Sequence, residues 1–350
     1  MSGAGAGVPR SRARSLARAL VALLVGVPGA LVLVLAVSLG AASARERVPR
    51  AARAPAAGRL VPSGDLRLFV QEAGPADGRL VVLVHGTGAW GEIWRPVADA
   101  LARAGFHVVA VDMPPFGFSD RSRSGAYSVA AQAGRLGALL DELRADSVIL
   151  VGHSFGARAT LQAALADPGR VARVVLVDAA LSISDTTSAP APAPLGLQVA
   201  LSARPVRAGL VAATVTNPLL TRTFTGQLVA FPDRLTDAQI EMLQRPMRQP
   251  GTSWAAGAWI HDFLLEPAPP VREARRALAN LPAPVHVVWG ELDSLTPVAQ
   301  GQDLARLARC ATWDVLPGTG HIPGLEAPDL LARTLVTRLS APPPRCAAAR

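Results

Sequence analysis

The chain has 350 residues, of which half are hydrophobic and 17% are charged. This composition provides enough apolar side chain for a large core and excludes a protein that is disordered over most of its length. The net charge of +9 is concentrated at the start of the chain, because residues 1–59 hold nine arginines and one acidic residue. The rest of the chain is almost neutral and has no basic stripe interleaved with aromatic residues, so nucleic acid is not expected as a partner.

An uncharged apolar segment follows the basic, Gly/Ala-rich residues 1–18. Residues 19–39 run for 21 residues without a charge, which is long enough for a helix to span a bilayer. A cleaved signal peptide is the alternative, because Ala42-Ser43-Ala44 resembles a small-residue cleavage site. We favour an uncleaved single-pass anchor, since the apolar regions of signal peptides usually span only about 7–15 residues.

The predicted localisation is therefore the membrane, with the folded domain on the extracytoplasmic side, and secretion is the alternative. Arginines flank the apolar segment on both sides, so the positive-inside rule gives only a weak orientation. Residues 40–59 are rich in Ala, Pro and Arg and predict a polar linker that lifts the domain off the membrane.

Residues 60–180 and 281–340 alternate apolar strand patterns with helical patterns. This spacing predicts an α/β fold, a doubly wound and mainly parallel sheet with helices on both faces. Strands are expected at residues 66–70 (an antiparallel edge), 80–84, 106–111, 147–151, 171–177, 285–289 and 312–316. Helices are expected at residues 93–104, 129–143, 155–166, 298–308 and 327–339, and residues 341–350 form a Pro/Ala tail.

The alternation stops between residues 181 and 280, which are rich in Pro and Ala and carry helical fragments but no strong strand. This segment holds many of the bulky apolar residues of the chain. We interpret it as a helical cap insertion over the carboxyl ends of the strands. Most of its bulky residues are expected to form a small core of their own, and a fraction to face the cleft.

The motif that organises the chain is Gly152-His153-Ser154-Phe155-Gly156, between the expected strand 147–151 and the helix that ends before Asp167. A serine in so tight a strand-to-helix turn leaves room only for glycine two residues before and two residues after it. The turn exposes the hydroxyl at the N-terminus of a helix, where amide groups and the helix dipole favour developing negative charge.

A serine hydroxyl needs an adjacent base that is itself held by an acid. Asp293 lies in the loop after the expected strand 285–289, and His321 lies in the loop after the last strand. Loops at the carboxyl ends of parallel strands share one side of the sheet, so we expect Ser154, Asp293 and His321 to meet there. Asp178 also ends a strand and is the alternative acid.

Further motifs occur in the same order along the chain. They are His85-Gly86, Trp94, the run Asp112-x-Pro-x-Phe-Gly-x-Ser, and Gly320-His321 up to Glu326-Ala327-Pro328. Together with the serine turn and the Asp293 loop, they resemble the α/β-hydrolase family over about residues 60–340. The resemblance implies that the backbone N–H groups of Thr87 and Phe155 form an oxyanion hole.

The favoured function is a serine hydrolase that cleaves a carboxylic ester or a related acyl substrate through the triad Ser154, His321 and Asp293. Hydrolysis of a C–C bond or cofactor-free perhydrolysis on the same triad is the alternative, and a non-catalytic binding protein of this fold is a third. A serine in the turn argues against haloalkane dehalogenases and epoxide hydrolases, which use aspartate there. The substrate is expected to be a small molecule with an apolar acyl group, held by Trp90, Trp254 and Trp259.

No cofactor, nucleotide or metal is expected. The isolated histidines lack metal-ligand spacing, and no phosphate-binding loop follows a strand. His85 and His153 flank the serine turn, and we assign them structural roles. Cys310 and Cys346 could pair in an oxidising compartment and pin the tail to the body, or could be two unrelated thiols.

Overall fold

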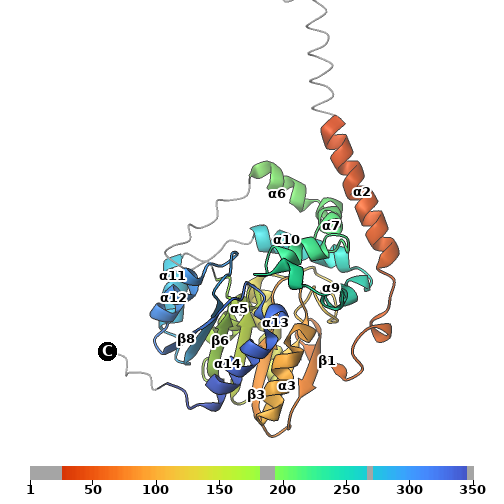
Figure 1. Ribbon diagram of the computed structural model, residues 1–350. Coiled ribbons are helices and arrows are strands. Elements are labelled where there is room, and N and C mark those ends of the chain that lie inside the picture. Colours follow the sequence, from red (N-terminus) through yellow and green to blue (C-terminus); the bar gives the residue numbers. More distant parts are fainter. Residues whose placement is uncertain (1–25, 182–193, 266–270, 345–350) are drawn as a thin grey trace, which may run out of the picture.

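A computed structural model describes residues 26–181, 194–265 and 271–344. Its centre is an eight-stranded sheet in the order β1-β2-β4-β3-β5-β6-β7-β8 (Figure 1). β1 and β2 are antiparallel to each other, β2 is antiparallel to β4, and all other neighbours are parallel. The strands are β1 (Gly58–Ser63), β2 (Leu66–Ala73), β3 (Arg79–Val84), β4 (Phe106–Val111), β5 (Val148–His153), β6 (Val171–Val177), β7 (Val285–Gly290) and β8 (Ala311–Leu316). The predicted mainly parallel α/β sheet is confirmed.

Helices cover both faces of the sheet, and this is why the central strands are apolar throughout. Val82 and Val84 of β3 pack into the core on one face, whereas Val81 and Leu83 pack into the core on the other face. The first face carries α4 (Val129–Glu142), α5 (Gly156–Ala166) and α12 (Val298–Leu307). The second face carries α3 (Arg95–Arg103) and α14 (Pro328–Ser340).

The edge of the sheet differs from the prediction. Residues 66–70 were expected to be an edge strand, but β2 lies between β1 and β4, and β1 forms the edge. β1 begins at Gly58, inside the predicted linker, and pairs with β2 from Gly58–Gln71 to Ser63–Leu66. The sequence Gly-Arg-Leu-Val-Pro-Ser contains Gly and Pro, which are depleted in strands, so pattern alone does not identify it.

Helices fill the chain between β6 and β7, and the part that the structure describes there contains no strand. These helices are α6 (Leu195–Ser202), α7 (Arg204–Ala213), α8 (Thr221–Gly226), α9 (Asp237–Gln244), α10 (Thr252–Leu265) and α11 (Val271–Ala279). α7 and α10 cross in close contact, because a Cβ atom on Gly257 would lie 2.9 Å from the backbone N of Ala208. The shorter elements are η2 (Arg50–Ala52), η3 (Gly91–Trp94), η4 (Pro232–Arg234), η5 (Arg245–Arg248) and α13 (Pro323–Glu326).

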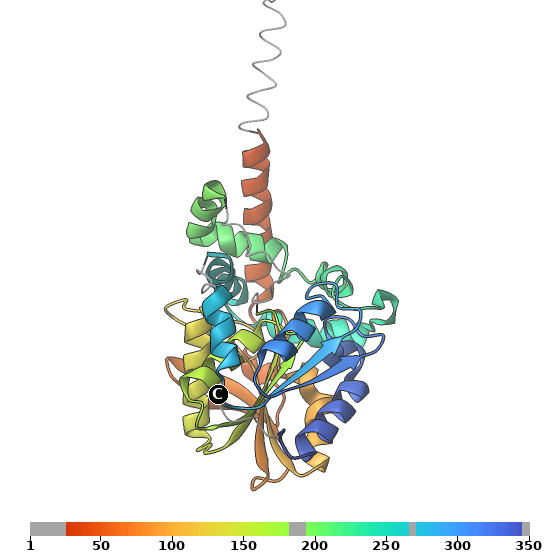
Figure 2. The ribbon, with the colours of Figure 1, turned by 90° about the vertical axis from the view of Figure 1, so that its left-hand side faces the viewer.

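The N-terminal helix α2 (Val27–Arg45) projects from the body of the protein, and α7 packs against it (Figures 1 and 2). It is long and apolar enough to cross a membrane, with a mean hydropathy of 2.1, although a signal sequence near the N-terminus passes the same test. The predicted span of residues 19–39 lies partly outside the described residues, and the helix extends six residues beyond its expected end, to Arg45.

The end of α2 is docked on the body and not held away from it by a linker. A Cβ atom on Gly209 of α7 would lie 2.9 Å from the Cβ of Leu35, so the two helices touch at their backbones. The buried Glu46 carboxylate accepts hydrogen bonds from the backbone N–H of Ser253, at 3.1 Å to each oxygen, and from the Ser253 hydroxyl. The residues directly after the helix therefore do not form the polar spacer that was expected for residues 40–59, because Glu46 is docked on Ser253.

We predict opposite effects on stability for two glycine-to-alanine substitutions. Gly290→Ala places a Cβ atom against the carbonyl O of Gly320, and such overpacking costs about 1–3 kcal/mol in the free energy of unfolding. Gly134→Ala lies in the exposed middle of α4 with nothing within 4 Å, and it should stabilise by about 0.5–1 kcal/mol through helix propensity. Denaturant unfolding of both variants measures this, and a neutral Gly290→Ala would show that the β7 and β8 loops are not tightly packed.

Candidate active site

Ser154 sits between β5 and α5 in a left-handed backbone conformation, with φ of +51°. The residues two positions before and two positions after it must be glycines, because a side chain would not fit there. A Cβ atom on Gly152 would lie 2.7 Å from the Cα of Ala157, and one on Gly156 would overlap the carbonyl O of His85. This is the geometry that the G-x-S-x-G pattern predicts. The hydroxyl was expected to be exposed, but Ser154 is only 7% exposed.

The structure brings the three expected side chains together. The Ser154 Oγ lies 2.8 Å from Nε2 of His321, and Nδ1 of the same imidazole lies 2.8 Å from Oδ2 of Asp293. Asp293 follows β7 and His321 follows β8, so both come from loops at the carboxyl ends of neighbouring parallel strands. One imidazole therefore connects a hydroxyl and a carboxylate in a single hydrogen-bonded chain.

The Asp293 carboxylate is held by donors from its own loop. Its Oδ1 accepts from the backbone N–H groups of Leu295 (2.9 Å) and Thr296 (2.8 Å), and its Oδ2 accepts from the Thr296 hydroxyl at 2.6 Å. Burial alone would raise the pKa of Asp293, but the hydrogen bonds and charge of His321 and the bonds from Thr296 lower it below its usual value. The role of Thr296 in holding Asp293 was not predicted from the sequence. The signal for it is that Asp side chains often accept hydrogen bonds from residues two or three positions further along a turn.

Backbone contacts fix His321 from two sides. Its N–H donates to the carbonyl O of Leu228 at 2.8 Å, and its own carbonyl O lies 2.7 Å from Nε2 of His153. Burial, followed by the nearby His321, lowers the pKa of His153 to about 3, so the neutral ring donates this hydrogen bond. His153 thus positions the base through its backbone.

His85 holds the loop after β3 in a similar way. Burial lowers its pKa to about 4, which makes the ring neutral at ordinary pH. Its Nε2 accepts from the N–H of Met113 at 2.8 Å, and Nδ1 donates to the carbonyl O of Gly86 at 2.7 Å. Both ring nitrogens are occupied by backbone groups, which matches the structural role expected for this residue.

Asp178, the alternative acid, is not at the imidazole. It ends β6 with φ of +43° and is completely buried. Its Oδ1 accepts from the N–H of Gly290 at 2.8 Å, and its Oδ2 is buried without a hydrogen-bond partner among the described residues. Burial and then the charge of Asp293 raise the pKa of Asp178 well above its usual value. Asp293, and not Asp178, therefore bonds to the imidazole of His321.

Thr87 and Phe155 line one cavity, and His85, Gly86, Phe116 and Trp259 also line it. Within the described part of the chain, no group accepts a hydrogen bond from the backbone N–H of Thr87 or of Phe155. Two unpaired amides beside a nucleophilic hydroxyl are the arrangement that stabilises an oxyanion in acyl transfer.

Comparison with known proteins agrees with this geometry. Residues 79–328 match the alpha/beta hydrolase fold family. The chain belongs to this family. The "Magnesium-chelatase 30 kDa subunit" of Rhodobacter capsulatus is 30% identical over 280 residues, 77% of this chain and 89% of that protein. The "2-hydroxy-6-oxo-2,4-heptadienoate hydrolase" of Pseudomonas putida is 40% identical over 126 residues, 35% of this chain and 44% of that protein.

Solved structures show the same fold. The 2-hydroxy-6-oxo-6-phenylhexa-2,4-dienoate hydrolase of Rhodococcus has a TM-score of 0.64 and 23% identity, over 81% of this chain and 98% of that one. The family and its named hydrolases identify this protein as a hydrolase.

Of the three tryptophans expected to hold the substrate, one lines the cavity next to Thr87 and Phe155 in this α/β hydrolase. Trp259 of α10 lines it, with ring contacts to Phe155 (5.7 Å between centroids), Phe116 (5.1 Å) and Phe263 (5.0 Å). These rings fill most of the space and leave about 10 Å³, which holds about one water molecule.

The other two tryptophans lie elsewhere. Trp90 is fully buried against Phe118, with 5.1 Å between ring centroids, and its Nε1 donates to the carbonyl O of Met242 at 2.8 Å. Trp254 is 44% exposed and lines a different cavity. Trp90 and Trp254 therefore do not line the cavity next to Thr87 and Phe155, contrary to expectation. The order of residues in the sequence does not show which side of a helix or loop faces a cavity.

In the part of the chain that the structure describes, no group of three His, Cys, Asp or Glu residues is placed to hold a metal ion. Cys310 lies just before β8 and is buried. Cys346 lies outside the described residues, so the pairing of the two cysteines stays a prediction.

We predict that Asp178→Asn removes one component of the pH dependence of stability. A carboxyl whose pKa is raised by folding contributes stability below its unfolded pKa, near 3.8, and loses that contribution as pH rises through its folded pKa. The Asn amide is isosteric, can accept the hydrogen bond from the N–H of Gly290 and does not titrate. Urea unfolding between about pH 4 and pH 9 should show a flatter curve for the variant. Parallel curves for the two proteins would mean that Asp178 is ionised in the folded state.

Proposed function

We propose that this α/β hydrolase is a serine hydrolase that cleaves a carboxylic ester or a related acyl substrate through an acyl-enzyme. The hydrogen-bonded chain from Asp293 through His321 to Ser154 carries the proposal. No other group among the described residues joins a hydroxyl nucleophile to a base beside two unpaired backbone amides. The fold alone would not support a reaction type, because one fold hosts many activities.

In the proposed mechanism, Oγ of Ser154 attacks the acyl carbon while Nε2 of His321 takes the hydroxyl proton. The negative charge moves to the acyl oxygen, which accepts hydrogen bonds from the N–H groups of Thr87 and Phe155. The tetrahedral intermediate expels the alcohol, which receives the proton from His321. A water molecule, deprotonated by the same imidazole, then hydrolyses the acyl-enzyme and frees Ser154. Asp293 holds the imidazole and stabilises its positive charge in both steps.

Hydrolysis of a C–C bond is the second candidate, and one observation favours it. The Pseudomonas putida relative, named a 2-hydroxy-6-oxo-2,4-heptadienoate hydrolase, is 40% identical over about a third of this chain. The same serine, histidine and oxyanion amides would serve either leaving group, and neither reaction needs a cofactor. A panel of aryl esters and vinylogous 1,5-diketo acids distinguishes the two activities. A binding protein without catalysis would react with neither and would not be labelled by a fluorophosphonate.

We propose further that the segment between β6 and β7 is a cap, with α10 as its inner wall. Trp259 and Phe263 of α10 pack against Phe155, which follows the nucleophile. These rings make the acyl side of the cavity apolar, which supports an apolar acyl group. The remaining space is smaller than an acyl chain, so α10 or the Trp259 ring has to shift before longer groups enter.

The proposed location is a membrane, with α2 as an N-terminal anchor. Val27, Leu31, Val32, Leu33 and Val34 are all more than half exposed. This supports a lipid environment for the first half of the helix, because soluble proteins rarely expose large contiguous apolar patches. The second half, from Leu35 onward, packs on α7, so the cap would lie next to the bilayer surface.

We expect Ser154→Ala and Asp293→Asn to reduce kcat for ester hydrolysis roughly a thousandfold or more, because both residues act chiefly in the transition state. Asp178→Asn is the matched control, since it makes the same chemical change to the neighbouring carboxyl and should keep most activity. Circular dichroism verifies that each variant is folded. A damaging Asp178→Asn with a harmless Asp293→Asn would place the acid one strand earlier.

We expect Trp259→Ala to favour longer acyl groups. Each methylene that enters the enlarged cavity contributes about 0.8 kcal/mol, or roughly fourfold in binding. The ratio of kcat/KM for butyryl over acetyl esters should therefore rise roughly tenfold or more. Phe224→Ala serves as control, because this ring is partly exposed on α8 and does not line the cavity. An unchanged ratio in the Trp259 variant would show that the acyl group binds elsewhere.

The anchor proposal is tested by fractionation and by sequencing the N-terminus of the purified protein. We expect the protein to need detergent for extraction and its N-terminus to lie upstream of Ala19. A freely soluble protein that begins at Arg45 would support secretion instead.

A further inference from the structure

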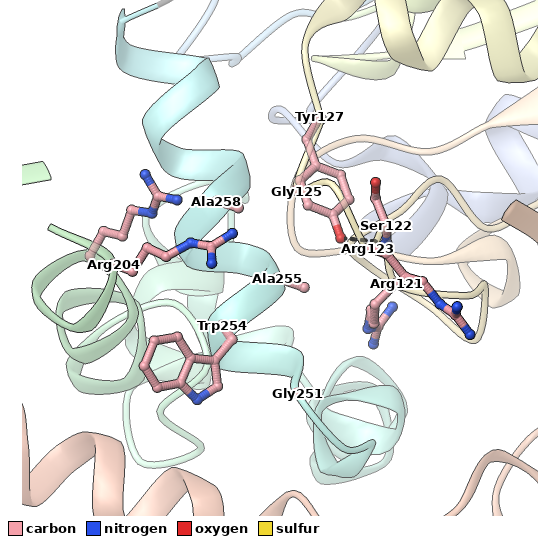
Figure 3. A pocket seen from close by; sticks show the side chains of 11 residues that line it. Arg121, Ser122, Arg123, Gly125, Tyr127, Arg204, Gly251, Trp254, Ala255 and Ala258 are labelled. Atoms are coloured by element: carbon pink, nitrogen blue, oxygen red, sulfur yellow. Dashed lines mark hydrogen bonds between the residues drawn. The ribbon is translucent and has the colours of Figure 1, made fainter. Parts of the chain in front are cut away.

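A second cavity, of about 280 Å³, lies on the seam between the cap and the core. One wall is the loop that carries Arg121, Arg123 and Tyr127, and the other is α7 with Arg204 and Arg207. Figure 3 shows Arg204 on the α7 side and Arg121 and Arg123 on the loop side, with Trp254, Ala255 and Ala258 of α10 between them. We call this space the arginine cavity.

The four guanidinium groups have no carboxylate among the residues that line the cavity. Within residues 26–181, 194–265 and 271–344, none of the four forms an ion pair within 4.0 Å. Arg121 reaches only neutral oxygens, namely the Thr252 hydroxyl at 3.2 Å and backbone carbonyls at 3.4 Å. Its Nε is buried without a hydrogen-bond partner.

The acidic groups nearest to the cavity already have other partners. Asp65 binds Arg135, and Asp120 binds Arg67 and Arg50. Glu46 accepts three hydrogen bonds from Ser253.

Asp262, whose charge acts on Arg207, accepts the N–H of Tyr127 at 2.7 Å and lies 3.2 Å from Nδ1 of His261. The lining of the arginine cavity thus contains four arginines and no acidic residue, and Arg121 and Arg123 also line a neighbouring cavity that contains Asp65 and Asp120.

We propose that the arginine cavity binds a phosphate group, carried by the headgroup of an anionic phospholipid or by a soluble phosphate. Guanidinium groups bind phosphate oxygens through paired, charge-assisted hydrogen bonds. A phosphate in this cavity would supply a negative group to arginines that have no ion-pair partner among the described residues. This proposal does not depend on the proposed ester hydrolysis.

The surroundings of the cavity favour the lipid as the source of the phosphate. α6 packs on α7 and exposes Leu195, Leu197 and Val199. α7 packs against α2, and α6 and α7 lie at the end of the molecule from which α2 projects (Figures 1 and 2). Trp254, at the wall of the cavity, is itself nearly half exposed. A headgroup in the cavity would place its acyl chains along these apolar side chains.

The test uses the purified full chain in a neutral detergent and isothermal titration calorimetry. The probes are inorganic phosphate and a short-chain phosphatidylglycerol, each at the same ionic strength set with sodium chloride. We expect saturable binding to the wild-type protein and a higher thermal midpoint with the probe. In Arg204→Gln/Arg207→Gln the Kd should rise roughly tenfold or more, because two charge-assisted contacts are lost.

Arg272→Gln/Arg333→Gln is the matched control, since it removes the same charge from exposed arginines away from the cavity and should keep the wild-type Kd. If the α7 double variant fails to fold, Arg123→Gln on the exposed loop carries the test, with a weaker Kd as the expected result. Binding of both probes would show that free phosphate suffices, and binding of phosphatidylglycerol alone would identify the lipid.

The proposal is overturned if neither probe binds saturably at millimolar concentration. It is also overturned if the control variant loses as much affinity as the α7 variant, because the effect would then be one of net charge.

Discussion

The site depends on strand-end loops that approach each other more closely than side chains would permit. Gly156 sits on the carbonyl of His85, and a Cβ atom on Gly86 would lie 2.8 Å from that of Ser154. These contacts bring the loop after β3 against the turn after β5. Thr87 and Phe155 then line one cavity, and Ser154 lies against the Gly86 backbone next to it. Backbone contact therefore sets the distance between Ser154 and the amides that we propose as oxyanion donors.

Burial then determines which groups of the site carry charge. His85 and His153 are neutral because their rings are buried, and burial next to Asp293 raises the pKa of Asp178 well above its usual value. Asp293 is buried as well, but four hydrogen-bond donors keep it ionised. The imidazole of His321 therefore faces one negative charge, that of Asp293. The loop of Asp293 fixes the orientation of this carboxylate. An arrangement of this kind favours one tautomer of the base, with the free electron pair on the side of Ser154.

Those features that depend on local sequence, such as strand ranges and strand-end loops, could be predicted from the sequence. β4 and β6 match their predicted ranges because continuous apolar runs between turn residues have few other solutions in an α/β fold. Ser154, Asp293 and His321 could be found because topology places all loops after parallel strands at one edge. The positions of Trp90 and Trp254 could not, since they depend on how helices far apart in sequence pack on one another. The docking of Glu46 on Ser253 joins residues 207 positions apart, and no local pattern encodes such a contact.

The contacts of α2 have a consequence for how this protein matures. Ala42 is completely buried, and Arg45 is the last residue of the helix. A peptidase that cut after Ala44 would have to act before the helix docks, because the bond lies in a formed helical turn beside a buried residue. Cleavage there would also uncover the backbone of α7 around Gly209 and separate Ser253 from a helix that holds Glu46 in place. Helix α2 is thus part of the packed body, and a shortened recombinant chain that starts at β1 would expose the surfaces of α7 and α10 that α2 and Glu46 cover.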